Sequence, residues 1–270
     1  MANQLLAGKK GIVFGALDEL SIAWKVAEKA HAEGASLILT NAPVALRMGK
    51  INSLAERLDA PLVPADATSM EDINKLLDVA EERFGKIDFV LHSIGMSPNV
   101  RKKRAYTNLN YDWLNKTYDV SAVSLHKTCQ ALYERDLMNE WGSILALSYI
   151  AAQRTFGKYA DMADAKALLE SIARSFGYHY GRKAKVRVNT ISQSPTPTTA
   201  GTGVPGFDKM LAFGEKMSPL GNAPADACAD YCLAMFSDYT RMVTMQNLFH
   251  DGGFSSVGIS EDLLESLELE

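Results

Sequence analysis

Two tyrosines and a lysine are the residues in this chain best suited to carry chemistry: Tyr149, Tyr159 and Lys166. Tyr149 precedes Tyr159 by ten positions, and Lys166 follows it by seven. A phenol can polarise a carbonyl oxygen, and an ammonium can bind a cofactor hydroxyl and favour a more acidic phenol. This combination of groups suits the transfer of a hydride next to a carbonyl.

The segments around these residues indicate how they are placed. An apolar run at residues 143–148 predicts a buried strand, and apolar residues at helical spacing predict a helix from Tyr159 to about Tyr180. Seven residues make nearly two helical turns, which would put Tyr159 and Lys166 on one face, about 10 Å apart along the axis. A Tyr and a Lys also occur together by chance on half-exposed helices. The pair therefore indicates a catalytic site only in combination with motifs in the rest of the chain.

The composition limits the class of protein. The chain has 270 residues, 47 % apolar and 22 % charged, as in globular proteins. Its net charge of −4 argues against nucleic acid or an anionic membrane as a general partner. Three cysteines, Cys129, Cys228 and Cys232, form no Cys-x-x-Cys pair, so we expect reduced thiols and no metal site. Without a signal peptide or transmembrane run, we expect a cytoplasmic protein.

Strand-like and helix-like segments alternate along the whole chain. This alternation predicts an α/β fold with a Rossmann-like doubly wound parallel sheet, in a single domain over residues 1–270. We predict strands at residues 11–15, 35–40, 61–65, 87–93, 143–148, 186–191 and 243–250. We predict helices at residues 21–33, 45–58, 70–84, 112–137, 159–180 and 224–236. The one long irregular stretch, residues 193–219, is rich in Pro and Gly, and we predict that it is a substrate-binding loop acting as a lid.

The first strand-to-helix turn is placed to bind a dinucleotide. Gly15 ends the first predicted strand, where a missing side chain lets the backbone approach a pyrophosphate. The helix that follows begins at Ser21 and Ile22, and its free N–H groups favour an anion. The Ser21 hydroxyl can cap the helix or donate to a phosphate. The turn lacks a Gly-x-Gly-x-x-Gly motif, so its position in the fold carries this prediction.

Two other strand ends supply candidate cofactor contacts. Asp66 and Ala67 follow the third strand, where Asp66 can accept from an adenine amino group or act as an ordinary turn residue. Ser93, Ile94 and Gly95 end the fourth strand, where Gly95 would let a ribose or nicotinamide pack closely, or would serve a turn.

The end of the second strand does not decide between NADH and NADPH. It carries no Asp or Glu to bind the ribose 2′-hydroxyl and exclude a 2′-phosphate. Arg47 and Lys50 follow it and could reach such a phosphate.

Six ordered motifs, spread over essentially the whole chain, resemble the short-chain dehydrogenase/reductase superfamily and, within it, the divergent NADH-dependent enoyl-acyl-carrier-protein reductases. That branch uses Tyr-x6-Lys with a second tyrosine ten residues upstream, whereas the ordinary branch uses Tyr-x3-Lys, which no tyrosine here matches. The other motifs are Gly-x5-Ser-Ile-Ala at 15–23, His-Ser-Ile-Gly at 92–95, Arg-Val-Asn-x-Ile-Ser at 187–192 and Asp-Gly-Gly-Phe at 251–254.

The resemblance implies the NAD(P)H-dependent reduction of the trans-2 double bond of an enoyl thioester on acyl-carrier protein, in fatty acid elongation. It implies that Tyr159 hydrogen-bonds the developing enolate, that Lys166 holds the nicotinamide ribose, and that Tyr149 lines the substrate side and assists. Implied cofactor contacts are Gly15, Ser21, Ile22, Asp66, Ala67, Ser93, Ile94, Gly95, Lys166, Pro195, Thr196 and Thr198. Implied substrate contacts are Ser97, Tyr149, Tyr159, Met162 and Phe207, although Met162 could equally be ordinary helix packing. The resemblance also implies a homotetramer.

Three departures from the family pattern leave cofactor preference and inhibitor sensitivity open. Gln193-Ser194-Pro195 replaces Ala-Gly-Pro, Met96 replaces a common phenylalanine, and the second strand lacks the usual glutamine. Acyl chain length and carrier-protein affinity are also undetermined. Two other functions are alternatives: a superfamily reductase acting on a ketone, which would need the Tyr-x3-Lys spacing, and a catalytically silent nucleotide-binding regulator, which would be expected to lack Tyr159 or Lys166.

Overall fold

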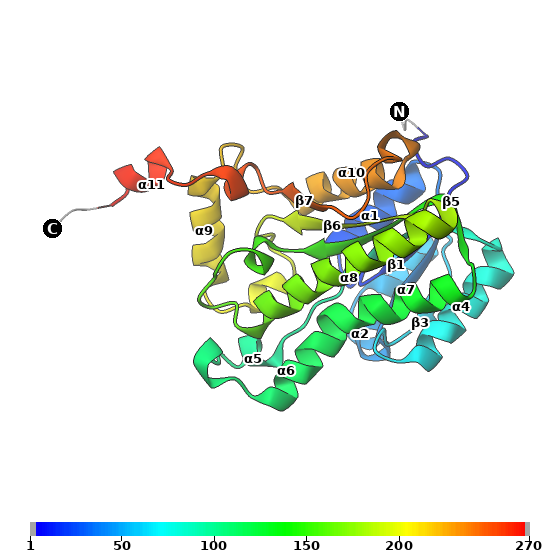
Figure 1. Cartoon of the computed structure of the whole chain (residues 1–270), viewed down its shortest axis with the longest axis horizontal. Coiled ribbons are helices and arrows are strands. Elements are labelled where there is room, and N and C mark those ends of the chain that lie inside the picture. Colours follow the sequence, from blue (N-terminus) through cyan, green and yellow to red (C-terminus); the bar gives the residue numbers. More distant parts are fainter. Residues whose placement is uncertain (1–3, 268–270) are drawn as a thin grey trace.

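Seven parallel strands form one sheet in the order β3-β2-β1-β4-β5-β6-β7 (Figure 1). The computed structural model describes residues 4–267. The strands are β1 (Lys10–Phe14), β2 (Ser36–Asn41), β3 (Leu62–Pro64), β4 (Ile87–His92), β5 (Met138–Ser148), β6 (Arg187–Gln193) and β7 (Asn247–His250). The order reverses between β1 and β4, where doubly wound sheets open a crevice at the carboxyl ends of their strands. This confirms the predicted Rossmann-like, single-domain α/β fold.

Helices cover both faces of the sheet, because strands apolar on both sides must be buried on both sides. They are α1 (Ile22–Ala32), α2 (Pro43–Met48), α3 (Ile51–Arg57), α4 (Met70–Phe84), α5 (Pro98–Arg101), α6 (Tyr111–Tyr118), α7 (Ser124–Glu134), α8 (Asp161–Ala184), α9 (Phe207–Met217), α10 (Ala225–Phe236) and α11 (Glu261–Glu265). α1, α3 and α10 pack on one face, and α4, α7 and α8 pack on the other. Among residues 4–267, no helix is both long and apolar enough to cross a lipid bilayer.

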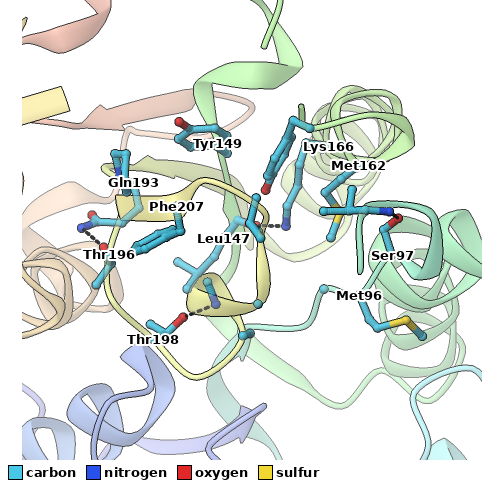
Figure 2. Close-up of a pocket in the computed structure, with 18 of the residues that line it drawn as sticks. Met96, Ser97, Leu147, Tyr149, Met162, Lys166, Gln193, Thr196, Thr198 and Phe207 are labelled. Carbon is cyan, nitrogen blue, oxygen red and sulfur yellow. Dashed lines mark hydrogen bonds between the residues drawn. The ribbon is translucent and has the colours of Figure 1, made fainter. Parts of the chain in front are cut away.

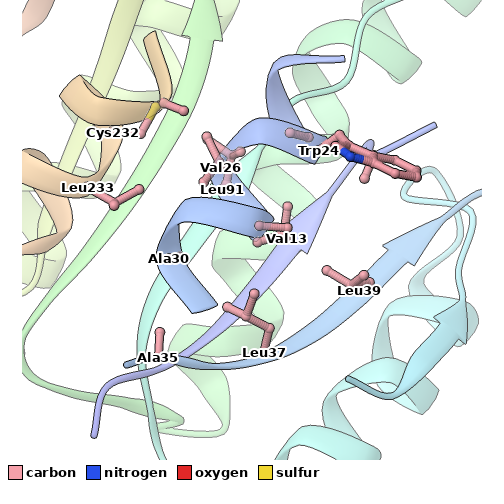
Figure 3. Close-up of a cluster of buried hydrophobic side chains, with 14 of the residues drawn as sticks. Val13, Trp24, Val26, Ala30, Ala35, Leu37, Leu39, Leu91, Cys232 and Leu233 are labelled. Atoms are coloured by element: carbon pink, nitrogen blue, oxygen red, sulfur yellow. The ribbon is translucent and has the colours of Figure 1, made fainter. Parts of the chain in front are cut away.

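The core on the α1 side shows how sequence spacing becomes packing (Figure 3). Val26 and Ala30, one helical turn apart on α1, face Val13 and Leu91 of the neighbouring strands β1 and β4. Cys232 of α10 closes the same cluster, and all five residues are fully buried. This layer fixes the distance between α1 and the sheet, and so places the first strand-to-helix turn.

Two of the predicted helices are interrupted. The helix predicted at 45–58 breaks into α2 and α3 at Gly49, whose backbone is extended and packs so tightly that a Cβ there would lie 2.5 Å from the Leu17 carbonyl oxygen. The helix predicted at 112–137 is α6 and α7 joined by a π-helical segment, Asp119–Val123. The widened turn presents Ser121, whose hydroxyl accepts from the backbone N–H of Met96 and donates to its carbonyl.

The elements around the tyrosines also differ from the prediction. The helix predicted to begin at Tyr159 begins at Asp161, because Ala160 has φ 42° and ψ −135°, outside the helical region. The stretch predicted to be irregular, residues 193–219, contains the helix α9, which buries Phe207 and Met217. β5 begins earlier than predicted, at Met138, and β7 later, at Asn247. The helix predicted at 70–84 coincides with α4.

Candidate active site

A pocket lies at the carboxyl ends of β4, β5 and β6, between α8 and the segment from Pro195 to Met210 (Figure 2). Predicted site residues that line it are Ile22, Ser93, Ile94, Gly95, Ser97, Tyr149, Tyr159, Met162, Lys166, Pro195, Thr196, Thr198 and Phe207. Gly15, Ser21, Asp66 and Ala67 are not among its lining residues. The pocket therefore brings together the predicted nicotinamide and substrate contacts with Ile22 of the pyrophosphate side, and leaves out the other pyrophosphate contacts and the adenine contacts.

The two tyrosines and the lysine meet in this pocket. The rings of Tyr149 and Tyr159 are tilted by 57°, with centroids 5.1 Å apart. Lys166 reaches from α8 to the end of β5, where its Nζ donates a hydrogen bond of 2.6 Å to the carbonyl oxygen of Leu147 (Figure 2). The phenols and the ammonium are thus fixed from different elements, the tyrosines by the chain after β5 and the lysine by α8.

Tyr159 lies in a turn that precedes α8, so the turn and not the helix determines its position. It lies two residues before the first residue of α8, so the predicted alignment of Tyr159 and Lys166 on two turns of one helix is wrong. Its backbone N–H donates to the carbonyl of Phe156, and its own carbonyl accepts from the N–H of Met162. Both bonds hold the turn against the start of the helix.

Burial sets the protonation of these groups. It lowers the pKa of Lys166 to about 8, and the charge of Glu170 acts in the opposite direction. Tyr159 is partly exposed as a residue, but burial around its hydroxyl raises its pKa, and burial together with Tyr159 raises that of Tyr149. The expectation that Lys166 makes the phenol more acidic is therefore wrong, because desolvation dominates. Both phenols are neutral hydrogen-bond donors near neutral pH.

Gly95 keeps open the space in front of these groups. A Cβ at this position would lie 3.4 Å from the Cε of Met162 and 3.7 Å from the Nζ of Lys166. Next to it, Ser93 and Ile94 also line the pocket. A flat group bound here would contact the backbone of residue 95 on one side and Lys166 on another.

Ser97, a predicted substrate contact, lines the pocket but uses its hydroxyl inside the protein. Its Oγ donates to the carboxylate of Asp161 at 2.6 Å and accepts from the N–H of Val100 at 3.0 Å, as the cap of α5. Asp161 is fully buried and also accepts from Asn99 Nδ2 and Thr117 Oγ1, each at 2.8 Å. Its place in the first turn of α8 suits a negative charge. One carboxylate therefore ties α5 and α6 to α8.

The first strand-to-helix turn packs against the end of β4. Gly15 has φ 94°, and a Cβ there would lie 2.0 Å from the carbonyl oxygen of Ser93, so only glycine fits. Ser21 stands at the cap position of α1 but makes no side-chain capping bond. Its hydroxyl instead accepts from the N–H groups of Leu17 and Asp18. The prediction that this hydroxyl caps the helix is therefore wrong, and its contact with a phosphate stays a prediction.

The adenine-side residues make turn contacts. Asp66 follows β3, and its Oδ1 accepts from the N–H and the hydroxyl of Thr68, as the turn interpretation expects. Asn41, at the end of β2, donates from its Nδ2 to the carbonyl of Ala16 and so joins this strand to the first turn. Lys50 forms an exposed ion pair with Glu19 at 3.7 Å. A role of Asp66 and Ala67 in binding adenine stays a prediction.

The segment after β6 is anchored by the residues that depart from the family motif. Gln193 donates to Thr196 Oγ1 and to the carbonyl of Ala223, and its Oε1 is 2.7 Å from His250 Nδ1. Ser194 accepts from the N–H of Ala223 at 3.0 Å. Pro195, Thr196 and Thr198 therefore enter the pocket from a backbone tied to the strand β7.

Sequence reasoning missed part of the lining. The missed residues outside the predicted substrate-binding loop are Met96, Val100, Arg101, Leu147 and Ser148. Within that loop, residues 193–219, the lining residues that were not predicted individually are Gln193, Ser194, Ala200, Gly201, Gly203, Val204 and Met210. Met96 and Gln193-Ser194 could have been found, because they interrupt motifs whose neighbours were predicted as contacts. Arg101 and Met210 carry no local signal, since their place depends on how α5 and α9 fold back over the strand ends.

Comparisons with known proteins identify the family. Residues 15–255 match the enoyl-(acyl carrier protein) reductase family. The chain is 33 % identical over 255 residues to enoyl-[acyl-carrier-protein] reductase [NADH] 2 of Rhizobium meliloti, covering 94 % of each chain.

Solved structures extend the likeness to three dimensions. The FabI–NADH complex from Alistipes finegoldii has a TM-score of 0.96 and 63 % identity, with coverage of 98 % of this chain and 94 % of that one. FabI from Bacillus cereus, in complex with NADP+ and indole naphthyridinone, has a TM-score of 0.89 and 30 % identity, with coverage of 96 % and 100 %.

Proposed function

This chain belongs to the enoyl-(acyl carrier protein) reductase family, and from that premise we propose how its pocket performs the reaction. The activity is the NADH-dependent reduction of enoyl-acyl-carrier-protein thioesters in fatty acid synthesis. The observation that carries the proposal is the meeting of Tyr149, Tyr159 and Lys166 in one pocket beside Gly95.

The residues present fit a nicotinamide cofactor. Gly95 leaves free the space beside Lys166 that a side chain would fill, and the missing side chain of Gly15 lets the first strand-to-helix turn pack directly on the Ser93 carbonyl at the end of β4. Gly15, Ser21 and Ile22 would hold the pyrophosphate at the start of α1, and Ser93 to Gly95 with Thr196 would hold the nicotinamide half. Bound NADH supplies the hydride that reaches C3 of the enoyl thioester.

Tyr159 donates its phenolic proton in a hydrogen bond to the thioester oxygen, on which negative charge develops. Because burial raises the pKa of this phenol, it stays protonated and its donor is in place before the charge appears. Tyr149, with its ring centroid 5.1 Å from that of Tyr159, borders the same space and restricts how the thioester turns.

Lys166 binds the cofactor and does not transfer a proton in the reaction. Its ammonium is held by the Leu147 carbonyl and has two further donor protons, which it can offer to the hydroxyls of the nicotinamide ribose. The ammonium is the cationic group beside Gly95, so its charge also favours an anionic intermediate nearby.

The acyl chain would leave this centre between Met162 and Phe207. Both line the pocket, and Phe207 begins α9, where the chain turns back over the strand ends. We propose that residues 193–219 form the substrate-binding lid, with α9 as its moving part, and that the thioester arrives on acyl-carrier protein.

We also propose that the protein is a homotetramer with a cytoplasmic location. Light scattering at micromolar concentration tests the oligomeric state, and a monomeric mass would refute the homotetramer.

The activity is tested by following nicotinamide absorbance with two substrates. We expect NADH oxidation with a crotonyl or longer enoyl thioester and none with a β-keto thioester of the same length. Turnover of the keto substrate alone would assign the pocket to a ketone reductase. Binding of NADH without turnover of either would indicate a nucleotide-binding regulator.

A further inference from the structure

Glu170 is a buried acidic residue to which the proposed reaction gives no role. It lies on α8, one turn after Lys166, and only 4 % of its surface is exposed. One carboxylate oxygen accepts from Ser148 Oγ at 2.7 Å, and the other accepts from Gln153 Nε2 at 3.1 Å. A carboxylate is costly to bury unless such donors replace water, so its presence here needs a reason.

The two donors lie on either side of Tyr149. Ser148 directly precedes this tyrosine, and Gln153 follows the short 3-10 turn that comes after it. Glu170 therefore holds the chain before and after Tyr149 at the same time. Since the backbone of this turn sets the direction of the Tyr149 ring, loss of the two bonds would loosen the ring without removing it.

The negative charge of Glu170 also stabilises the ammonium form of Lys166. Burial disfavours the ammonium and lowers its pKa to about 8, and the charge of Glu170 opposes this effect. Three other titratable groups near the ammonium are neutral near neutral pH: His92 at the end of β4 has its pKa lowered to about 3, and burial raises the pKa of both Tyr149 and Tyr159. Arg101, which lines the same pocket, adds a positive charge. Change of charge at the centre near pH 8 is thus a property of Lys166.

We propose that Glu170 is a positioning residue for the reduction, which fixes the turn carrying Tyr149 and keeps a negative charge one helical turn from Lys166. The inference rests on the proposed function of the pocket. It adds a residue that touches neither substrate nor cofactor and acts through two residues that do.

The test is the pH profile of kcat/KM for Glu170→Gln with NADH and a crotonyl thioester. Removing the charge favours the neutral amine, so we expect the alkaline limb to move down by about one pH unit. We also expect kcat at pH 7 to fall about tenfold, which corresponds to one lost hydrogen bond. Glu134→Gln is the matched control: Glu134 is exposed, accepts from Gln130 at 2.8 Å on α7, and should leave both quantities unchanged.

Two further variants separate charge from geometry and remain informative if Glu170→Gln fails to fold. Gln153→Ala keeps the carboxylate but removes one donor, so kcat should fall while the alkaline limb stays at the wild-type pH. Glu170→Asp keeps the charge but shortens the reach to Ser148, with the same expected pattern. A Glu170→Gln enzyme with a wild-type alkaline limb would overturn the proposal, as would a Gln153→Ala enzyme whose limb moves as far as that of Glu170→Gln.

The proposal and the proposed function can fail separately. If the wild-type chain reduces no enoyl thioester, the function is refuted, and NADH titration across pH still tests whether Glu170 controls the charge of Lys166. If the wild-type chain is active and the NADH titrations of Glu170→Gln and wild type coincide at every pH, the role of Glu170 alone is refuted.

Discussion

The Nζ of Lys166 lies 2.6 Å from the carbonyl oxygen of Leu147, which stands two residues before Tyr149 at the end of β5. The bond crosses from a helix to the edge of the sheet. It anchors a flexible side chain at one donor and leaves the others directed to the pocket. Strand β5 and helix α8 therefore hold Tyr149 and Lys166 in a fixed relation.

Lys166→Ala should weaken NADH binding by about 10- to 100-fold, because charge-assisted hydrogen bonds to the ribose are lost. Fluorescence titration of NADH measures this directly. Lys75→Ala is the control, since Lys75 is an exposed lysine on α4 paired with Glu71. Equal affinity in wild type and Lys166→Ala would contradict the assigned role.

NADH affinity should depend on pH through the same lysine. Below its pKa of about 8, Lys166 is protonated and affinity should be constant. As the pH rises above this value the free enzyme loses the charge, so affinity should fall, by up to about tenfold for each pH unit. Isothermal titration at several pH values measures the curve, and Lys166→Ala should flatten it.

Tyr159→Phe should fold normally and lose about 10²–10³-fold in kcat, because one donor to the developing charge is removed. NADH affinity should stay near the wild-type value. Tyr178→Phe, which changes an exposed tyrosine of α8, should have wild-type turnover. If Tyr159→Phe turned over at the wild-type rate, the oxyanion donor would have to be another group.

Gly95→Ala should leave the stability of the fold nearly unchanged but weaken the binding of NADH. The added Cβ makes ordinary contacts of 3.4 Å and 3.7 Å with Met162 and Lys166, so the melting temperature should change little. The methyl group occupies the space beside Lys166, and NADH affinity should fall by about tenfold, the cost of mild overpacking. Gly157→Ala is the control because nothing lies within 4 Å of its added Cβ.

The segment that carries α9 should respond to ligand. Cleavage by trypsin at Lys209 or Lys216, both exposed on α9, requires local unfolding of this helix. NADH together with an enoyl thioester analogue should slow cleavage, as a lid that closes over the pocket would. Equal rates of cleavage with and without ligands would mean that the segment is only a connection.

The sequence predicts the sheet and the strand ends that position this site better than it predicts the residues that line the pocket. Alternating apolar strands and amphipathic helices determine a doubly wound sheet, and the ends of its strands then locate Gly15, Gly95 and Tyr149. The turn before α8 was not predictable in the same way, because the positive φ of Ala160 interrupts an otherwise helical pattern. α9 was missed because the prolines and glycines ahead of Phe207 suggested irregular structure through the whole segment.

The polar network around Asp161 was missed for another reason. Its donors, Ser97, Asn99 and Thr117, are far from it in sequence, and none has a spacing that predicts a shared partner. Only the fold brings them together. Ser97 lines the pocket, and its role as a substrate contact, implied by the family resemblance, stays a prediction.

The network at Asp161 gives the pocket walls of unequal stiffness. On the side of α5, α6 and α8, one buried carboxylate with three donors resists displacement, because moving any segment leaves a buried charge poorly satisfied. On the side of Thr198 to Met210, the lining consists of a short 3-10 turn and the first turn of α9, with local hydrogen bonds such as that from the Gly201 N–H to Thr198 Oγ1. A ligand that needs more room will gain it by displacing the second wall, so differences in inhibitor selectivity between this chain and its relatives should arise there.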